Sequence, residues 1–183
     1  WVIRQVLQKQ GELLRQHPQL YISVNLAAAD LVEARFPAEA QAALQAAGVP
    51  PAQLVYEVTE RGLVDPQRAV AVLEPLRQAG HRIAIDDFGT GYSSLSYLQQ
   101  LPVDVLKIDK SFVDALGTEA ASSPVAPHII AMARALGLKV IAEGVEQAEQ
   151  ARLLAELGAQ IGQGWLFAKP LSAEAFRAFV AAH

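Results

Sequence analysis

The chain has 183 residues, of which 52% are hydrophobic and 19% are charged, and its formal net charge is −4. These values exclude an intrinsically disordered chain and argue against a domain that binds a nucleic acid polymer through a basic surface. Cysteine is absent, which excludes disulfide bonds, thiolate zinc sites and a thiol nucleophile. No stretch predicts a membrane span or a signal peptide, so we expect a cytoplasmic domain.

Apolar residues spaced three and four apart predict an amphipathic helix over residues 1–16, with Trp1 packing as part of a helix face. Beyond it, short segments rich in β-forming residues alternate with helical segments. Strands are predicted over residues 20–26, 54–60, 82–87, 104–109, 138–143 and 159–163. Helices are predicted up to residue 47, over 66–79, around 93–99, up to about 136, over 147–157 and over 172–181. The alternation predicts right-handed βαβ units around a parallel sheet, in a single domain spanning residues 1–183.

Six polar residues lie near the C-terminal tips of the six predicted strands, one on each strand. They are Asn25, Glu57, Asp86, Lys107, Glu143 and Gln163. Because side chains alternate with a period of two, each shares a face with the residue two positions earlier, in order Ser23, Val55, Ala84, Val105, Ile141 and Ile161. Polar groups that converge from the ends of many strands favour a TIM-type (β/α)8 barrel over an open sheet. Since such a barrel has eight strands, we expect about two further βα units upstream of Trp1.

The third predicted strand ends in two adjacent acids, Asp86 and Asp87. Such a pair is often only a turn or a helix cap. Neighbouring side chains on a strand diverge, however, so the two carboxylates could face two metal ions, or one of them could bridge both ions. Asn25 and Glu57 add oxygen donors, and donors of this kind suit Mg²⁺ or Mn²⁺. Lys107 is predicted to point into the same space, where it could orient a nucleophilic water or neutralise phosphate charge.

The sequence strongly resembles the EAL-domain family of bacterial cyclic-di-GMP phosphodiesterases. The matching segments are residues 23–26 (SVNL), 57–60 (EVTE), 86–95 (DDFGTGYSSL), 106–109 (LKID), 143–146 (EGVE) and 163–167 (QGWLF). The resemblance implies a TIM-type barrel of the EAL type, represented here by about six βα units. It also implies hydrolysis of cyclic-di-GMP to the linear dinucleotide pGpG with two Mg²⁺ or Mn²⁺ ions.

The same resemblance implies roles for individual residues. The implied metal ligands are Asn25, Glu57, Asp86, Asp87 and Glu143. The implied catalytic residues are Lys107, which would orient the nucleophilic water, Glu143 and Asp87. The implied substrate-binding residues are Asp109, Gln163 and Glu146. A regulatory element that couples metal binding to contact between the subunits of a homodimer is implied for Glu60, Phe88, Gly89, Thr90, Gly91, Tyr92 and Ser93.

The chain also departs from the family pattern. No Glu-Ala-Leu segment occurs in it, which we expect because the N-terminal strands of the domain are not in this stretch. Trp165 stands where the family usually has Tyr, and Lys169 where Arg is common. If the whole protein lacks the signature segment, the alternative is a catalytically inactive receptor that binds cyclic-di-GMP. Sensory or cyclase domains are expected outside this chain.

Overall fold

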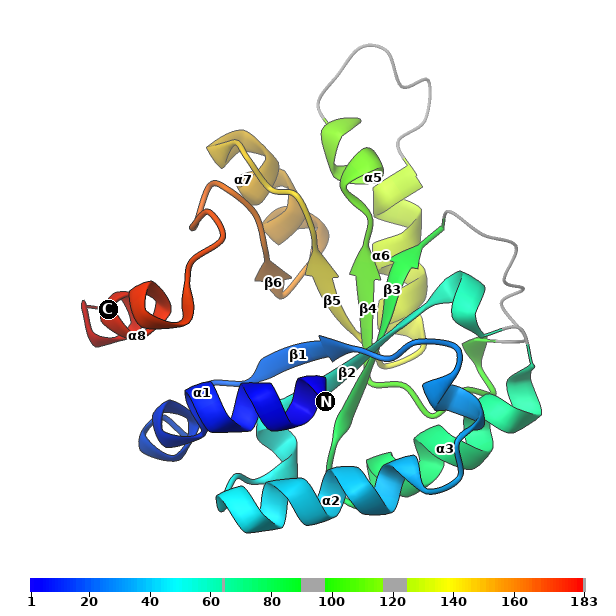
Figure 1. The fold of residues 1–183 in the computed structure, drawn as a ribbon. Helices are drawn as coiled ribbons and strands as arrows, with labels where there is room; N and C mark the ends of the chain where they lie inside the picture. Colours follow the sequence, from blue (N-terminus) through cyan, green and yellow to red (C-terminus); the bar gives the residue numbers. More distant parts are fainter. Residues whose placement is uncertain (64, 90–97, 117–124, 183) are drawn as a thin grey trace.

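The computed structural model describes residues 1–63, 65–89, 98–116 and 125–182. Six parallel strands form one sheet, in which each strand pairs with the strand that precedes it and the strand that follows it in the sequence (Figure 1). The strands are β1 (Ile22–Asn25), β2 (Leu54–Thr59), β3 (Arg82–Phe88), β4 (Val105–Ile108), β5 (Lys139–Ala142) and β6 (Ile161–Gly162). All six lie within or beside the predicted segments, and this strand order is that of a half-barrel.

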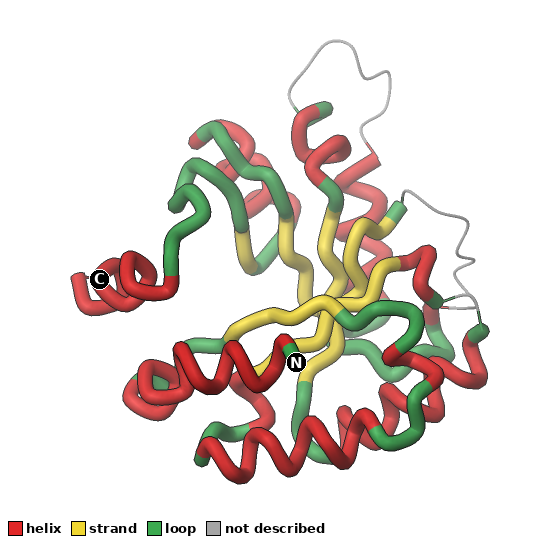
Figure 2. The backbone as a smooth tube through the Cα atoms, viewed as in Figure 1, coloured by secondary structure: helices red, strands yellow, loops and turns green. Residues whose placement is uncertain are grey.

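The helices of the described residues are α1 (Val2–Gln16), α2 (Phe36–Ala47), α3 (Pro66–Gln78), α5 (Lys110–Asp114), α6 (Val125–Ala135), α7 (Ala148–Leu157) and α8 (Ala173–Ala182). Those from α1 to α7 pack against the outer side of the sheet, whereas α8 lies apart from the sheet and contacts α1 (Figure 2). Three 3-10 helices accompany them: η1 (Asp30–Val32), η2 (Pro51–Gln53) and η3 (Glu60–Gly62). In the part of the chain that the structure describes, no helix combines the length and the apolar character that a membrane span needs.

Two of the predicted helices do not correspond to a single helix among the described residues. The segment after β4 was expected to hold one long helix, but its described residues form the short helix α5 and the separate helix α6. The carboxylate of Asp109 accepts a hydrogen bond from the backbone N–H of Ser111 at 3.0 Å, so α5 begins immediately after the strand. Most of the helix predicted around residues 93–99 lies outside the described residues.

The strands carry two separate apolar layers. Val55, Ala84, Val105 and Ile141 form a small cluster inside the half-barrel, together with the partly buried Tyr21. The alternate residues of the same strands belong to the larger cluster that packs against the helices; examples are Tyr56, Ile83, Leu106 and Val140. The predicted alternation of the two faces is therefore confirmed for the four central strands.

Strands β1 and β6 are the two ends of the sheet, and the helices beside them are in contact. The side-chain amide of Gln10 in α1 donates to the backbone carbonyl of Ala173 at 3.1 Å. Arg177 of α8 donates to the carbonyl of Lys9 in α1 at 2.7 Å. Trp1, which was expected to pack on a helix face, is instead 88% exposed, and it stands immediately before the first turn of α1.

Between the sheet and its helices lies a buried histidine. His81 is 2% exposed, and its ring lies 4.9 Å from the ring of Tyr56, measured between centroids. Its Nδ1 atom is 3.4 Å from the carbonyl oxygen of Leu54, and among the described residues Nε2 has no hydrogen-bond partner. Burial lowers the pKa of the His81 imidazole, although its hydrogen bonds to backbone carbonyls oppose the shift, so the folded protein favours the neutral ring.

This burial predicts a pH-dependent stability. As the pH falls below the ordinary imidazole pKa of about 6.5, the unfolded chain binds a proton at residue 81 that the folded chain resists, so folding loses free energy. The loss is at most about 1.4 kcal/mol at pH 5.5. We expect His81→Gln to reduce the drop in unfolding free energy between pH 7.5 and 5.5, as measured by denaturant titration. His128→Gln, which changes an exposed histidine of α6, is the control, and an unchanged drop in His81→Gln would refute the account.

Candidate functional site

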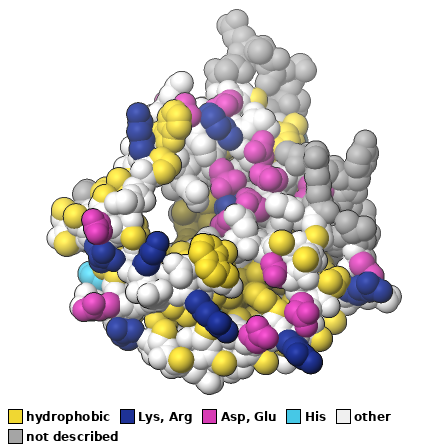
Figure 3. Space-filling model, in the orientation of Figure 1, with side chains coloured by type: hydrophobic (Ala, Val, Ile, Leu, Met, Phe, Trp, Pro, Cys, Tyr) yellow, Lys and Arg dark blue, Asp and Glu magenta, His cyan; other side chains and the backbone are white. Residues whose placement is uncertain are grey.

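Acidic side chains gather around a basic one on the face of the molecule where the strands end (Figure 3). Glu57 of β2 and Asp86 of β3 each lie near the carboxyl end of their strand, and Glu143 follows β5 directly. The backbone N–H of Glu143 donates to the carbonyl of Ile108 at 3.0 Å, which continues the pairing of β5 with β4 to this level. Parallel pairing thus brings three carboxylates to one end of the half-barrel.

Lys107 of β4 lies at the centre of this acidic cluster and is only 3% exposed. Its Nζ atom contacts Glu57 Oε1 at 2.9 Å, Asp86 Oδ1 at 2.9 Å and Glu143 Oε1 at 2.8 Å. Burial alone would lower the pKa of the Lys107 ammonium, but its hydrogen bonds to the three carboxylates outweigh burial and raise that pKa. The side chain is therefore charged, and its three N–H donors meet three acceptors.

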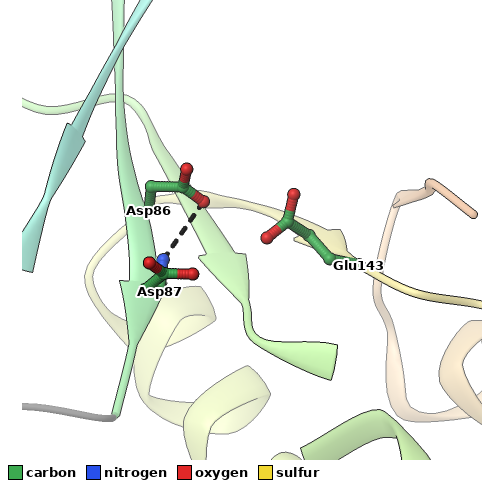
Figure 4. Close-up of side chains that lie close together, drawn as sticks. All are labelled: Asp86, Asp87 and Glu143. Carbon is green, nitrogen blue, oxygen red and sulfur yellow. Dashed lines mark hydrogen bonds between the residues drawn. The ribbon is translucent and has the colours of Figure 1, made fainter. Parts of the chain in front are cut away.

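The adjacent acids Asp86 and Asp87 lie on one side of β3 and not on opposite sides (Figure 4). The pairing of β3 with β4 shifts between Ile85 and Phe88, where three steps along β3 match two steps along β4. Asp87 also has a left-handed backbone with φ of 54°, and its N–H donates to Asp86 Oδ1 at 3.1 Å. The expectation that the two side chains diverge is therefore wrong, because a β-bulge interrupts the alternation.

Asp86, Asp87 and Glu143 form a group that could hold a metal ion. Each offers one carboxylate oxygen, and these oxygens lie within 4.8 Å of one another. Burial raises the pKa of Glu143, and the nearby Asp86 adds to that shift while Lys107 opposes it. The site thus has an excess of negative charge in a poorly solvated position, and hard oxygen donors of this kind fit Mg²⁺ or Mn²⁺. Asn25 of β1 is exposed and pairs in register with Glu57, so it lies at the rim of the site.

The predicted substrate-binding residues lie beside this cluster. Asp109, Glu146 and Gln163 line a groove of about 470 Å³ that Glu143 also lines, so the groove is continuous with the acidic cluster. The hydrogen bonds that Asp109 accepts from Ser111 lower the pKa of its carboxyl group. Lys110 also lines the groove and lies 3.2 Å from Glu146, measured from Nζ to Oε1. Lys110 was not among the predicted site residues, although it directly follows the strand predicted over residues 104–109.

The predicted regulatory element is described in part. Glu60 in η3 is buried, and its Oε2 accepts a hydrogen bond from the backbone N–H of Gly89 at 3.0 Å. Gly89 follows Phe88, the last residue of β3, so this bond ties η3 to the end of the strand that carries Asp86 and Asp87. Gly89 has a φ of 96°, and an added Cβ would lie 2.9 Å from the Phe112 ring. Thr90, Gly91, Tyr92 and Ser93 lie outside the described residues.

Comparison with known proteins places these features in one family. The family model of the EAL domain matches residues 1–170. The Escherichia coli protein named probable cyclic di-GMP phosphodiesterase PdeB is 47% identical over 182 residues, which are 100% of this chain and 34% of that protein. The cyclic di-GMP phosphodiesterase NbdA of Pseudomonas aeruginosa is 41% identical over 185 residues, covering 100% of this chain and 24% of that protein. The chain thus spans about a third or less of the length of these relatives.

Solved structures have the same fold. The MucR phosphodiesterase in complex with c-di-GMP matches with a TM-score of 0.89 and 37% identity, over 96% of this chain and 72% of that one. The EAL domain of Mycobacterium smegmatis DcpA matches with a TM-score of 0.92 and 34% identity, over 100% of this chain and 83% of that one. The family model matches most of the chain, and two relatives match all of it at more than 40% identity. The chain therefore belongs to the EAL domain family.

Proposed function

We propose that the chain is part of a cyclic-di-GMP-specific phosphodiesterase, which adds water across one phosphodiester bond of cyclic-di-GMP to give linear pGpG. The observation that carries the proposal is the cluster of three carboxylates around the buried Lys107, open to a groove at the carboxyl ends of the strands. The names of PdeB and NbdA, and the c-di-GMP complex of MucR, support this choice of substrate.

Two Mg²⁺ or Mn²⁺ ions complete the proposed site. The residues that would hold them are Asn25, Glu57, Asp86, Asp87 and Glu143. When bound, the two ions supply a positive charge that polarises the phosphodiester and favours deprotonation of the attacking water. The oxygens of Asp86, Asp87 and Glu143 support this assignment, since they lie within 4.8 Å of one another.

Lys107 has a role that depends on its hydrogen bonds. An ammonium group has three N–H donors, and in the structure Glu57, Asp86 and Glu143 accept all three. We propose that Lys107 orients the nucleophilic water, which would replace one of these carboxylates as a hydrogen-bond acceptor. Asp87 and Glu143 would then keep that water aligned with the phosphorus atom.

On the substrate side, we propose that Asp109, Glu146 and Gln163 contact cyclic-di-GMP in the groove that they line with Glu143. Asp109 and Glu146 are already held in place, the first by Ser111 and the second by Lys110. Groups fixed in this way lose little conformational entropy on binding.

Regulation forms the last part of the proposal. The bond between Glu60 and Gly89 would carry changes at η3 to the metal ligands on β3, and residues 88–93 would couple metal binding to a homodimer contact. The homodimer is tested by light scattering, in which a monomer at micromolar concentration would count against it. We also propose sensory or cyclase domains in the whole protein and a cytoplasmic location, which the absence of cysteine fits.

Replacing one metal ligand tests the activity directly. Asp86→Asn keeps the shape of the side chain but removes its charge, so we expect Mn²⁺-dependent hydrolysis of cyclic-di-GMP to fall by more than about 100-fold. Chromatography of the nucleotides, with and without EDTA, measures the loss, and Glu39→Gln on the exposed surface of α2 is the control. Wild-type turnover in Asp86→Asn would refute the metal assignment. Binding without hydrolysis in the unaltered protein would favour the receptor alternative.

Removing the central ammonium tests the charge balance. In EDTA, Lys107→Met leaves three carboxylates without their shared cation, so we expect the free energy of unfolding to fall by about 3–5 kcal/mol. Mn²⁺ should restore part of this loss, so its stabilising effect should be larger in Lys107→Met than in the unaltered protein. Denaturant titrations in EDTA and in Mn²⁺ measure both quantities. Lys139→Met, at an exposed position of β5, is the control, and equal stability of the two variants in EDTA would contradict the account.

A further inference from the structure

The groove beside the acidic cluster has an aromatic wall that the proposed mechanism does not use. Three segments that follow strands form the groove: Lys110 begins α5 after β4, Glu143 and Glu146 follow β5, and Trp165 and Lys169 follow β6. Glu143 belongs both to the groove and to the group that could hold a metal ion. A ligand with its reacting phosphate at the acidic cluster therefore has its neighbouring part in this groove.

Trp165 offers a large flat surface to that groove. Its side chain is 60% exposed, although tryptophan is usually largely buried. The Nζ atom of Lys169 lies 5.5 Å from the centre of the Trp165 ring, a distance typical of a cation–π contact. An exposed indole in contact with a cation combines a stacking surface for a base with a positive charge for a phosphate.

The backbone around Trp165 is fixed relative to the acidic cluster. Val145, two residues after Glu143, donates its N–H to the carbonyl of Gln163 at 3.0 Å and accepts from the N–H of Leu166 at 3.0 Å. At Gly164 an added Cβ would lie 2.2 Å from the carbonyl oxygen of Val145, so only glycine allows the two loops to come this close. The indole is thus presented by a loop bonded on both sides to the segment that carries Glu143 and Glu146.

We propose that Trp165, with Lys169 beside it, is a stacking platform for one purine base of the dinucleotide. The inference rests on the proposed function, because it requires the phosphodiester of that dinucleotide to lie at the acidic cluster. Stacking on an aromatic ring accepts any base, so the platform contributes to affinity for a nucleotide and not to the choice among bases. Lys169 adds a second positive charge, besides that of Lys110, to a groove that three carboxylates also line.

Tryptophan fluorescence tests the platform without relying on turnover. The chain has two tryptophans, so Trp1→Phe leaves Trp165 as the sole tryptophan, and Trp165→Phe leaves Trp1. We expect cyclic-di-GMP to quench the emission of Trp1→Phe in a saturable manner, in Mg²⁺ and in EDTA, and to leave Trp165→Phe unchanged. Ribose 5-phosphate, which has the phosphate but no base, should quench neither variant.

Steady-state kinetics provide the second measurement. Trp165→Ala should raise the KM for cyclic-di-GMP by about 5- to 100-fold with little change in kcat, because a stacked base contributes equally before and during the reaction. Trp165→Phe keeps a ring and should lie between Trp165→Ala and the unaltered protein. Trp1→Ala is the matched control, since Trp1 is 88% exposed at the other end of the chain. Circular dichroism of each variant checks that the fold is retained.

The possible outcomes separate the two proposals. Hydrolysis by the unaltered protein, with no quenching at Trp165 and an unchanged KM in Trp165→Ala, would overturn the platform and leave the phosphodiesterase standing. Saturable quenching confined to Trp165, without hydrolysis, would support the platform and overturn the phosphodiesterase. Absence of both quenching and hydrolysis would overturn the two proposals together.

Discussion

The buried ammonium group of Lys107 is the charge on which the arrangement of the site depends. Glu57, Asp86 and Glu143 reach the end of the half-barrel on three different strands, and each contacts the same Nζ atom at 2.8–2.9 Å. Carboxylates held this close in a poorly solvated position repel one another, and burial of each carries a further desolvation cost. A single cation at the centre offsets both effects, so the ligands of a cation site can be preassembled before any metal ion binds.

A β-bulge in β3 brings the carboxylates of Asp86 and Asp87 to the same side of the strand, which a regular strand would not do. In a regular strand, Asp86 and Asp87 would point to opposite sides of the sheet. The bulge and the left-handed backbone of Asp87 turn both carboxylates towards Glu143. A left-handed conformation is tolerated by Asp better than by most residues, because its short polar side chain forms local hydrogen bonds. The two carboxylates stand on consecutive residues of β3, and the hydrogen bond from Gly89 to Glu60 restrains the end of that strand.

The sequence was sufficient to predict the positions of the six strands and, for the four central strands, the side that faces the interior. Parallel strands with a period of two leave few alternatives, and Val55, Ala84, Val105 and Ile141 form the interior cluster that this period requires. The bulge was beyond sequence reasoning because no glycine or proline marks it. The prediction for Trp1 was wrong because helical periodicity shows which residues share a face of the helix. It does not show whether another part of the chain packs against that face at its first turn. The closeness of Trp165 to the acidic cluster depends on hydrogen bonds between two loops, which no local pattern encodes.

The interior cluster of Val55, Ala84, Val105 and Ile141 has a consequence for how the acidic cluster attracts charged ligands. It lies below the carboxylates on the same strands and forms an apolar floor beneath them. A low-dielectric floor directs the electric field of the acidic cluster outward through that mouth. That field attracts cations and repels an anionic dinucleotide. Bound divalent cations would weaken this repulsion, so at the proposed site they would raise the affinity for an anionic dinucleotide.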